Sequence, residues 1–132
     1  MDKQQVRELW VNALESGEYE QCNMFLHKKF NSSEQFCCLG VLCDLYMKHV
    51  GGLEVEYYGQ EHNVYYDGHI SELPEKVREW VGLHSGAGDS IRSGEFMDKG
   101  DSLANLNDRG ASFEYIAGII EQSGKELFVE SN

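Results

Sequence analysis

The chain has 132 residues, of which 41% are hydrophobic and 26% are charged, so its length suits a single domain with one core. Its net charge is −12, from 23 acidic and 11 basic residues spread along the chain, and this charge disfavours a surface for nucleic acid phosphates. The apolar stretch 36–47 is too short to cross a bilayer, and the first residues lack the layout of a signal peptide. We therefore expect one globular domain over residues 1–132, located in the cytoplasm, with no membrane partner and no direct nucleic acid partner.

The first third of the chain contains one clear helical pattern. Val6, Trp10 and Leu14 recur at helical spacing before the stop signal Ser16-Gly17, which predicts an amphipathic helix over residues 3–15. Residues 18–30 have no clean period, so we expect a loop with short pieces of regular structure there. The same segment holds Lys28 and Lys29, the most basic spot in the sequence.

Residues 36–46 form an uninterrupted apolar run, Phe-Cys-Cys-Leu-Gly-Val-Leu-Cys-Asp-Leu-Tyr. Over residues 37–49 the apolar side chains cover almost the whole circumference of a helix, which predicts a buried central helix. Gly40 would let a neighbouring element approach this helix closely. The polar residues 31–35 before the run and the residues 48–52 after it are predicted to be loops.

The cysteines in this run admit two interpretations. Cys37, Cys38 and Cys43 could bind zinc together with His27 or His49, since zinc takes four thiolate or imidazole ligands. Structural zinc sites usually place two ligands on a short turn, however, whereas these thiols lie in a predicted apolar helix. We therefore expect free buried thiols that pack like small apolar side chains, with no metal and no cofactor.

The second half of the chain begins with a predicted hairpin and a short helix. Residues 53–58 alternate between apolar and polar side chains, residues 64–66 resume the apolar pattern, and the two segments read as antiparallel strands. Pro74 is well placed as the first residue of a short helix that ends at Gly82, with Trp80 as its apolar anchor.

From residue 82 to residue 100 the sequence is rich in glycine and serine, which indicates a long loop that is functional or mobile. A short strand pair around Ile91 and Phe96 would give part of it regular structure. The remaining elements are predicted from local patterns: a helical turn at residues 103–106, a tight turn at 107–110, a helix from the N-cap Ser112 to Gly124, and an edge strand at 127–129. These elements predict an α+β domain with about four helices packed around the buried central helix and a small antiparallel sheet or hairpin.

Two motifs suggest binding functions. The glycine-rich segment 84–90 could expose backbone N–H groups to a phosphate, but it lacks the lysine of nucleotide-hydrolase loops and is more simply a surface loop. Residues 103–117 resemble the opening of a helix-turn-helix, yet only eight residues follow Gly124, too few for a recognition helix. No serine nucleophile motif accompanies the five histidines, so no catalytic residue is predicted.

Four sequence blocks carry a resemblance to a known family. They have the forms SGxYxQ, FCCLGVLCD, LP followed by Val77 and Trp80, and LNDxGxSFxxIA, at residues 16–21, 36–44, 73–80 and 106–117. On these blocks the chain resembles a family of small, mostly uncharacterised bacteriophage proteins, which implies a phage origin. It departs from the family pattern at Glu20 and residues 22–24, where more basic and glycine-rich residues are expected.

Small phage proteins without catalytic motifs often act on host defence. Our leading hypothesis is a non-catalytic protein, which we do not expect to be an enzyme, that sequesters a nucleotide-derived immune signal such as a cyclic nucleotide or an ADP-ribose derivative, as a homo-oligomer. Aromatic rings would stack on a base, cations would meet phosphate, and amide or carboxylate groups would bind ribose or base. The candidate ligand-binding residues are Tyr19, Gln21, Lys28, Lys29, Asp44, Trp80, Arg92, Asn107 and Asp108, with Arg7 and Tyr57 as further candidates.

Two alternatives come from other functional classes. In the first, the chain is an acidic inhibitor of a nucleic-acid-binding host defence protein, and its binding would weaken with salt. In the second, the chain is an enzyme that degrades the same signals, and Asp44 or Asp108 could serve as acid or base.

Overall fold

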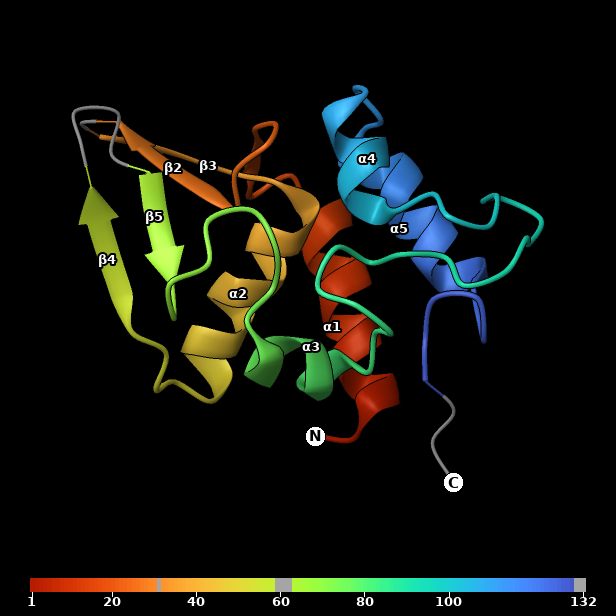
Figure 1. The fold of residues 1–132 in the computed structure, drawn as a ribbon. Coiled ribbons are helices and arrows are strands. Elements are labelled where there is room, and N and C mark those ends of the chain that lie inside the picture. Colours follow the sequence, from red (N-terminus) through yellow and green to blue (C-terminus); the bar gives the residue numbers. More distant parts are fainter. Residues whose placement is uncertain (31, 59–62, 130–132) are drawn as a thin grey trace.

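The computed structural model describes residues 1–30, 32–58 and 63–129, and in these it shows five helices beside a mixed five-stranded sheet (Figure 1). The helices are α1 (Lys3–Glu15), α2 (Cys38–His49), α3 (Glu75–Val81), α4 (Leu103–Asp108) and α5 (Phe113–Gln122). The strands are β1 (Glu20–Gln21), β2 (His27–Phe30), β3 (Ser33–Phe36), β4 (Val55–Tyr58) and β5 (Asn63–Tyr66). The predicted α+β class is confirmed.

Helix α2 is the centre of the domain, as its sequence predicts. Eight of its twelve residues are buried, and it lies between the sheet and α1 (Figure 1). A side chain on Gly40 would overlap the carbonyl oxygen of Leu26, so glycine permits the backbone before β2 to cross the helix. The indole Nε1 of Trp10 donates a 2.9 Å hydrogen bond to the carbonyl oxygen of Cys38, which joins α1 to the start of α2.

Helices α1 and α5 come from opposite ends of the chain and make the most extensive contact between any two helices described. Helix α1 begins with a capping box, in which Asp2 accepts a hydrogen bond from the Gln5 backbone N–H and the Gln5 side chain accepts one from the Asp2 N–H. The predicted cap Ser112 starts α5, since its hydroxyl accepts a hydrogen bond from Tyr115 N–H. No helix in the described ranges combines the length and apolarity needed to span a membrane.

The sheet has the strand order β1-β3-β2-β5-β4, and only the short pair β1–β3 is parallel. The hairpin of β4 and β5 was predicted, and the loop between them at residues 59–62 lies outside the described residues. Strands β2 and β3 were missed, since residues 18–35 were predicted to be mainly loop. Of their eight residues only His27 and Phe36 are buried, so no apolar alternation marks them.

The second half differs from the prediction in detail. Pro74 is the N-cap of α3 and not its first residue, while Gly82 ends that helix in the left-handed conformation. Helix α4 continues through Asp108, so the predicted tight turn begins later, around Gly110. Residues 82–102 form no strand pair, and the predicted edge strand at 127–129 is reduced to a single bridge between Leu83 and Phe128.

Candidate functional site

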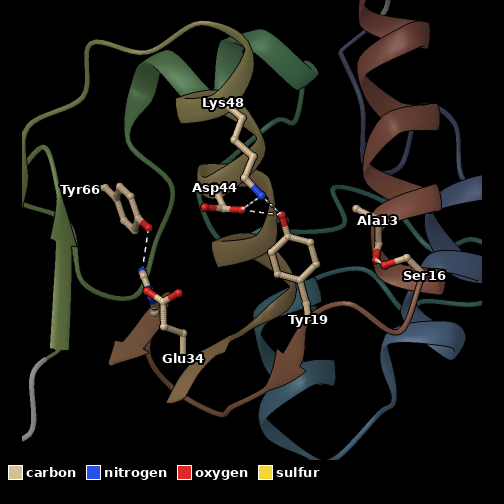
Figure 2. A network of polar contacts seen from close by, with 8 residues as sticks. Ala13, Ser16, Tyr19, Glu34, Asp44, Lys48 and Tyr66 are labelled. Atoms are coloured by element: carbon tan, nitrogen blue, oxygen red, sulfur yellow. Dashed lines mark hydrogen bonds and ion pairs between the residues drawn. The ribbon is translucent and has the colours of Figure 1, made fainter. Parts of the chain in front are cut away.

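Three side chains from α2 and the loop before β1 meet at the surface beside the sheet (Figure 2). The Tyr19 hydroxyl donates a 2.5 Å hydrogen bond to Oδ2 of Asp44, and the Lys48 ammonium lies 2.9 Å from the same oxygen. Asp44 and Lys48 are one helical turn apart on α2, a spacing that favours an ion pair. The Ser16 hydroxyl bonds to the Ala13 carbonyl oxygen at 2.6 Å and accepts from Glu18 N–H, which sets the path of the chain into Tyr19.

The Tyr19 hydroxyl is held in its protonated form. Partial burial and the neighbouring Asp44 carboxylate raise the pKa of Tyr19 to about 12, although Lys48 opposes the shift. The Tyr19 ring also contacts Phe36 edge to face, with 5.2 Å between ring centroids. Tyr19 is therefore fixed by a hydrogen bond at one end and by aromatic packing at its ring.

A second polar group also contacts Phe36, through His27. The ring of His27 stacks on Phe36 with centroids 4.1 Å apart. Its Nδ1 lies 2.8 Å from the Tyr66 hydroxyl, and its Nε2 lies 3.2 Å from Glu34. Burial lowers the pKa of His27, whereas Glu34 favours the charged ring and partly offsets this effect. His27 is 6% exposed and therefore interior, whereas the Glu34 side chain is 47% exposed and reaches the surface.

The hydroxyl, imidazole and carboxylate of this group are arranged in the order of a catalytic triad, but the hydroxyl is unsuited to attack. Tyr66 is 3% exposed, and burial raises the pKa of its phenol, which disfavours the phenolate. A nucleophile must reach its substrate and lose its proton, and Tyr66 is poorly placed for both. The contacts of His27 with Tyr66 and Glu34 instead link three strands of the sheet, β2, β5 and β3.

A hollow of about 450 Å³ opens beside the Tyr19 group. Four of its eight lining residues are acidic and one is a lysine, so its walls are rich in hydrogen-bond acceptors and carry net negative charge. Its lining consists of Glu18, Tyr19, Glu20, Ser32, Glu34, Phe36, Asp44 and Lys48. Of the predicted ligand-binding residues, Tyr19 and Asp44 line this hollow.

Two other predicted residues, Gln21 and Asn107, form an interior junction. The Asn107 oxygen accepts hydrogen bonds from Cys38 N–H at 3.1 Å and from the Gln21 amide at 2.9 Å, while its amide donates to the Cys22 carbonyl oxygen at 2.8 Å. Gln21 also donates to the Ala111 carbonyl oxygen. Asn107 has no exposed surface, and its hydrogen bonds join α4 to β1, α2 and the Cys22 backbone.

Asp108 lies at a different hollow, of about 440 Å³, next to the glycine-rich loop. Its Oδ1 accepts a 2.7 Å hydrogen bond from the N–H of Met24, which has a positive φ of 73°. Glu72, Asp89 and Asp108 all line this hollow, and no basic side chain of the described residues does. The structure therefore brings the predicted loop and Asp108 together, but in surroundings that disfavour a phosphate.

The predicted cations lie apart from both hollows. On β2, the ammonium groups of Lys28 and Lys29 lie over the rings of Phe25 and Tyr57, at 5.1 and 5.3 Å from the centroids. Arg92 is exposed in the irregular segment between α3 and α4.

Two further candidates lie on the helical side of the domain. Arg7 on α1 stacks over Phe128 at 3.7 Å, and its buried Nε has no hydrogen-bond partner among the described residues. Trp80 on α3 contacts Tyr46 edge to face at 5.3 Å, which supports its predicted anchoring role. The predicted ligand-binding residues thus occupy several places, and their roles stay predictions.

The four cysteines are unpaired and buried, as the packing interpretation predicts. Burial raises the pKa of Cys22 to about 11 and that of Cys37 to about 12, so these thiols are poor nucleophiles near neutral pH. Within the described ranges, no three His, Cys, Asp or Glu side chains come together in a way that would hold a metal ion.

Six of the eight residues that line the hollow had not been singled out as ligand-binding candidates, and neither had the neighbouring His27; the six are Glu18, Glu20, Ser32, Glu34, Phe36 and Lys48. A local signal exists for Lys48, because an acid and a base four residues apart in a predicted helix indicate an ion pair. The contacts of His27 with Phe36 and Tyr66 depend on strand pairing, which the polar sequences of β2 and β3 do not reveal.

The chain belongs to the family described as Domain of unknown function (DUF8296), whose model matches residues 1–124. The comparisons with curated proteins and with solved structures return no match.

Proposed function

We propose that this protein binds and sequesters a nucleotide-derived immune signal without turning it over, as a counter-defence protein of a bacteriophage in the cytoplasm of an infected bacterium. The observation that carries the proposal is the hollow beside Asp44, where an aromatic side chain, a carboxylate and an ammonium group face the same space. Its volume of about 450 Å³ lies within the range of small-molecule sites. A cyclic nucleotide or an ADP-ribose derivative combines groups that these side chains recognise.

Each part of such a ligand has a partner in the hollow. Tyr19 supplies an aromatic surface for a base or ribose. Asp44 supplies an acceptor for the hydrogen-bond donors of a base, and Lys48 supplies a cation for a phosphate. Lys48 is 63% exposed and can move from Asp44 to a ligand, because an exposed ion pair contributes only about 0–1 kcal/mol.

Binding without turnover is supported by the state of the candidate nucleophiles. The Tyr66 phenol and the four cysteine thiols are buried, and burial raises their pKa values. The Tyr19 hydroxyl is accessible but is held protonated by burial and by Asp44. These features favour a protein that holds its ligand unchanged.

Thermal unfolding with a ligand panel tests this function. The panel contains cyclic mononucleotides, cyclic dinucleotides, cyclic ADP-ribose and ADP-ribose, each at a concentration well above the protein. At least one ligand should raise the Tm of the protein, since binding to the folded state alone stabilises it. Mass spectrometry of the ligand recovered after denaturation should show an unchanged mass.

Two tyrosine variants show whether the hollow is responsible. Tyr19→Ala should abolish the rise in Tm, whereas Tyr115→Ala, at an exposed position on α5, should keep it. The proposal fails if no ligand stabilises the protein, if Tyr19→Ala responds like Tyr115→Ala, or if the recovered ligand is chemically changed. Sedimentation equilibrium with and without the ligand measures whether the bound form is the expected homo-oligomer.

A second candidate is an acidic inhibitor of a nucleic-acid-binding host defence protein. The net charge of −12 and the four carboxylates of the hollow favour it, because both attract a basic surface. It predicts binding to a basic host protein that weakens strongly between 50 and about 300 mM salt, as screening shortens the range of charge interactions. Nucleic acid should compete for the same host protein, and no ligand in the panel should raise the Tm.

A further inference from the structure

The carboxylate of Asp44 is fixed on one side and available on the other. Its Oδ2 accepts the hydrogen bond from Tyr19 and pairs with Lys48, while its Oδ1 receives no hydrogen bond from any described residue. The Asp44 side chain is 24% exposed and lines the hollow. The hollow therefore contains a hydrogen-bond acceptor whose orientation is set before any ligand arrives.

The hydrogen-bond acceptors in this hollow favour a ligand that carries hydrogen-bond donors. An ionised carboxylate only accepts hydrogen bonds, and four of the eight lining residues carry one. Guanine presents two adjacent donors, its N1–H and its 2-amino group, on one edge. Adenine and cytosine place a ring nitrogen acceptor beside their amino group, and uracil places carbonyl oxygens on both sides of its N–H.

We propose that the hollow is specific for guanine, so that the sequestered signal is a guanine nucleotide; this inference rests on the proposed function. The base lies against Tyr19 with its N1–H and 2-amino group directed at Asp44. When Lys48 turns to the ligand phosphate, Oδ2 keeps the hydrogen bond from Tyr19 and gains room for a base donor. An adenine in the same place would set its N1 lone pair against a carboxylate, which is repulsive.

The charge of the hollow limits the number of phosphate charges that a bound ligand can carry. Among the described residues Lys48 is the only basic one that lines the hollow, and Glu18 and Glu20 line it as well. One ammonium compensates one phosphodiester charge, whereas a triphosphate would bring several uncompensated charges close to carboxylates. The site therefore favours a cyclic phosphodiester over guanosine triphosphate.

Calorimetric titration with three cyclic 3′,5′-monophosphates tests the base specificity. The probes are those of guanosine, adenosine and xanthosine, which share the ribose and the phosphodiester and differ in the base. The wild-type protein should bind cyclic GMP roughly tenfold or more tightly than cyclic AMP, the discrimination typical of a two-point contact to a base edge. Guanosine triphosphate should bind more weakly than cyclic GMP.

The Asp44→Asn variant should bind a different base more tightly, and a misfolded protein could not show such a gain. An asparagine amide donates an N–H to the 2-carbonyl of xanthine and still accepts its N1–H, but it meets the 2-amino group of guanine with a donor. The variant should therefore lose cyclic GMP binding roughly tenfold or more and bind cyclic XMP more tightly than cyclic GMP. The control Glu114→Gln on α5 also removes one negative charge, at a position far from Asp44 in sequence. It should bind the cyclic monophosphates with the same order of affinities as the wild-type protein.

The outcomes separate the two proposals. Guanine specificity is overturned if the wild-type protein binds cyclic AMP as tightly as cyclic GMP, or if Asp44→Asn keeps the wild-type order. It is also overturned if none of the three monophosphates binds while another member of the thermal panel stabilises the protein through Tyr19. If no member of that panel stabilises the protein, the proposed function itself fails.

Discussion

Gly40 on α2 lies directly beneath the carbonyl oxygen of Leu26, and a side-chain carbon on Gly40 would overlap that oxygen. The obstructing atom belongs to the backbone, and it also accepts a hydrogen bond from Cys37 N–H at 3.1 Å, so it has little room to move. Gly40→Ala should therefore destabilise the protein by about 1–3 kcal/mol or more, measured by urea unfolding. Gly118→Ala is the control: that glycine lies in α5 with open space around it, and alanine there should stabilise the helix by about 0.5–1 kcal/mol. Equal effects at the two positions would contradict the close approach at Gly40.

Asn107 should be a major contributor to stability. Asn107→Ala removes the partners of two buried backbone groups, Cys38 N–H and the Cys22 carbonyl oxygen, and leaving such groups unsatisfied costs about 1–3 kcal/mol each. The urea midpoint should fall while the slope of the transition stays the same. Asn12→Ala, at an exposed position on α1, should change the free energy of unfolding by less than about 0.5 kcal/mol. A similar small effect for Asn107→Ala would refute its role as a junction.

His27 should make the protein less stable in mild acid. Burial lowers the pKa of His27 in the folded state below its unfolded value of about 6.5, so the unfolded chain takes up the proton first as the pH falls. The stability that the neutral ring contributes is complete above about pH 6.5 and is lost below it. We expect the difference in unfolding free energy between the wild-type protein and His27→Gln to shrink from pH 7.5 to pH 5.5. Parallel pH profiles for the two proteins would show that His27 does not titrate in this way.

The Tyr19 phenol should titrate near pH 12 and should report on Asp44. Burial is the main cause of the raised pKa and the Asp44 carboxylate is the next, so Asp44→Asn should lower the pKa of Tyr19 without returning it to its ordinary value of about 10. The signal is read by NMR from tyrosines labelled at the ring carbon that bears the hydroxyl, with Tyr19→Phe to assign it. Because the unfolded phenol ionises first, stability should fall between about pH 10 and pH 12. An unchanged pKa of Tyr19 in Asp44→Asn would exclude the hydrogen bond between the two residues.

The helices were predictable because their signals are local. The apolar spacing of α1, the apolar circumference of α2 and the cap at Ser112 each lie within a few positions of the element they define. Strands β2 and β3 have no such signal, since their regular structure depends on pairing with each other and with β5. The length of α4 was also missed, because Asn107 and Asp108 favour turns by themselves and are held in the helix by tertiary contacts.

Only two of the eight residues that line the candidate site were predicted from the sequence. Tyr19 and Asp44 were both identified, but the hydrogen bond between them joins positions 25 residues apart and follows from the fold. Asn107 was predicted to bind ribose or base and to lie in a turn, and in the structure it is a fully buried residue of α4, a position that its polar side chain does not indicate. The hollow depends on β1 pairing with β3, a contact of two residues per strand that leaves no pattern in the sequence.

The packing of α1 against α5 has a consequence for synthesis of the protein. The apolar face of α1, which includes the buried Trp10 and Leu14, contacts α5 more extensively than any other described helix. During translation at about 5–20 residues per second, this apolar face stays without its partner until nearly the whole domain has left the ribosome. The nascent chain must therefore expose its first helix for several seconds, and a stalled or truncated product would present that helix to chaperones and proteases.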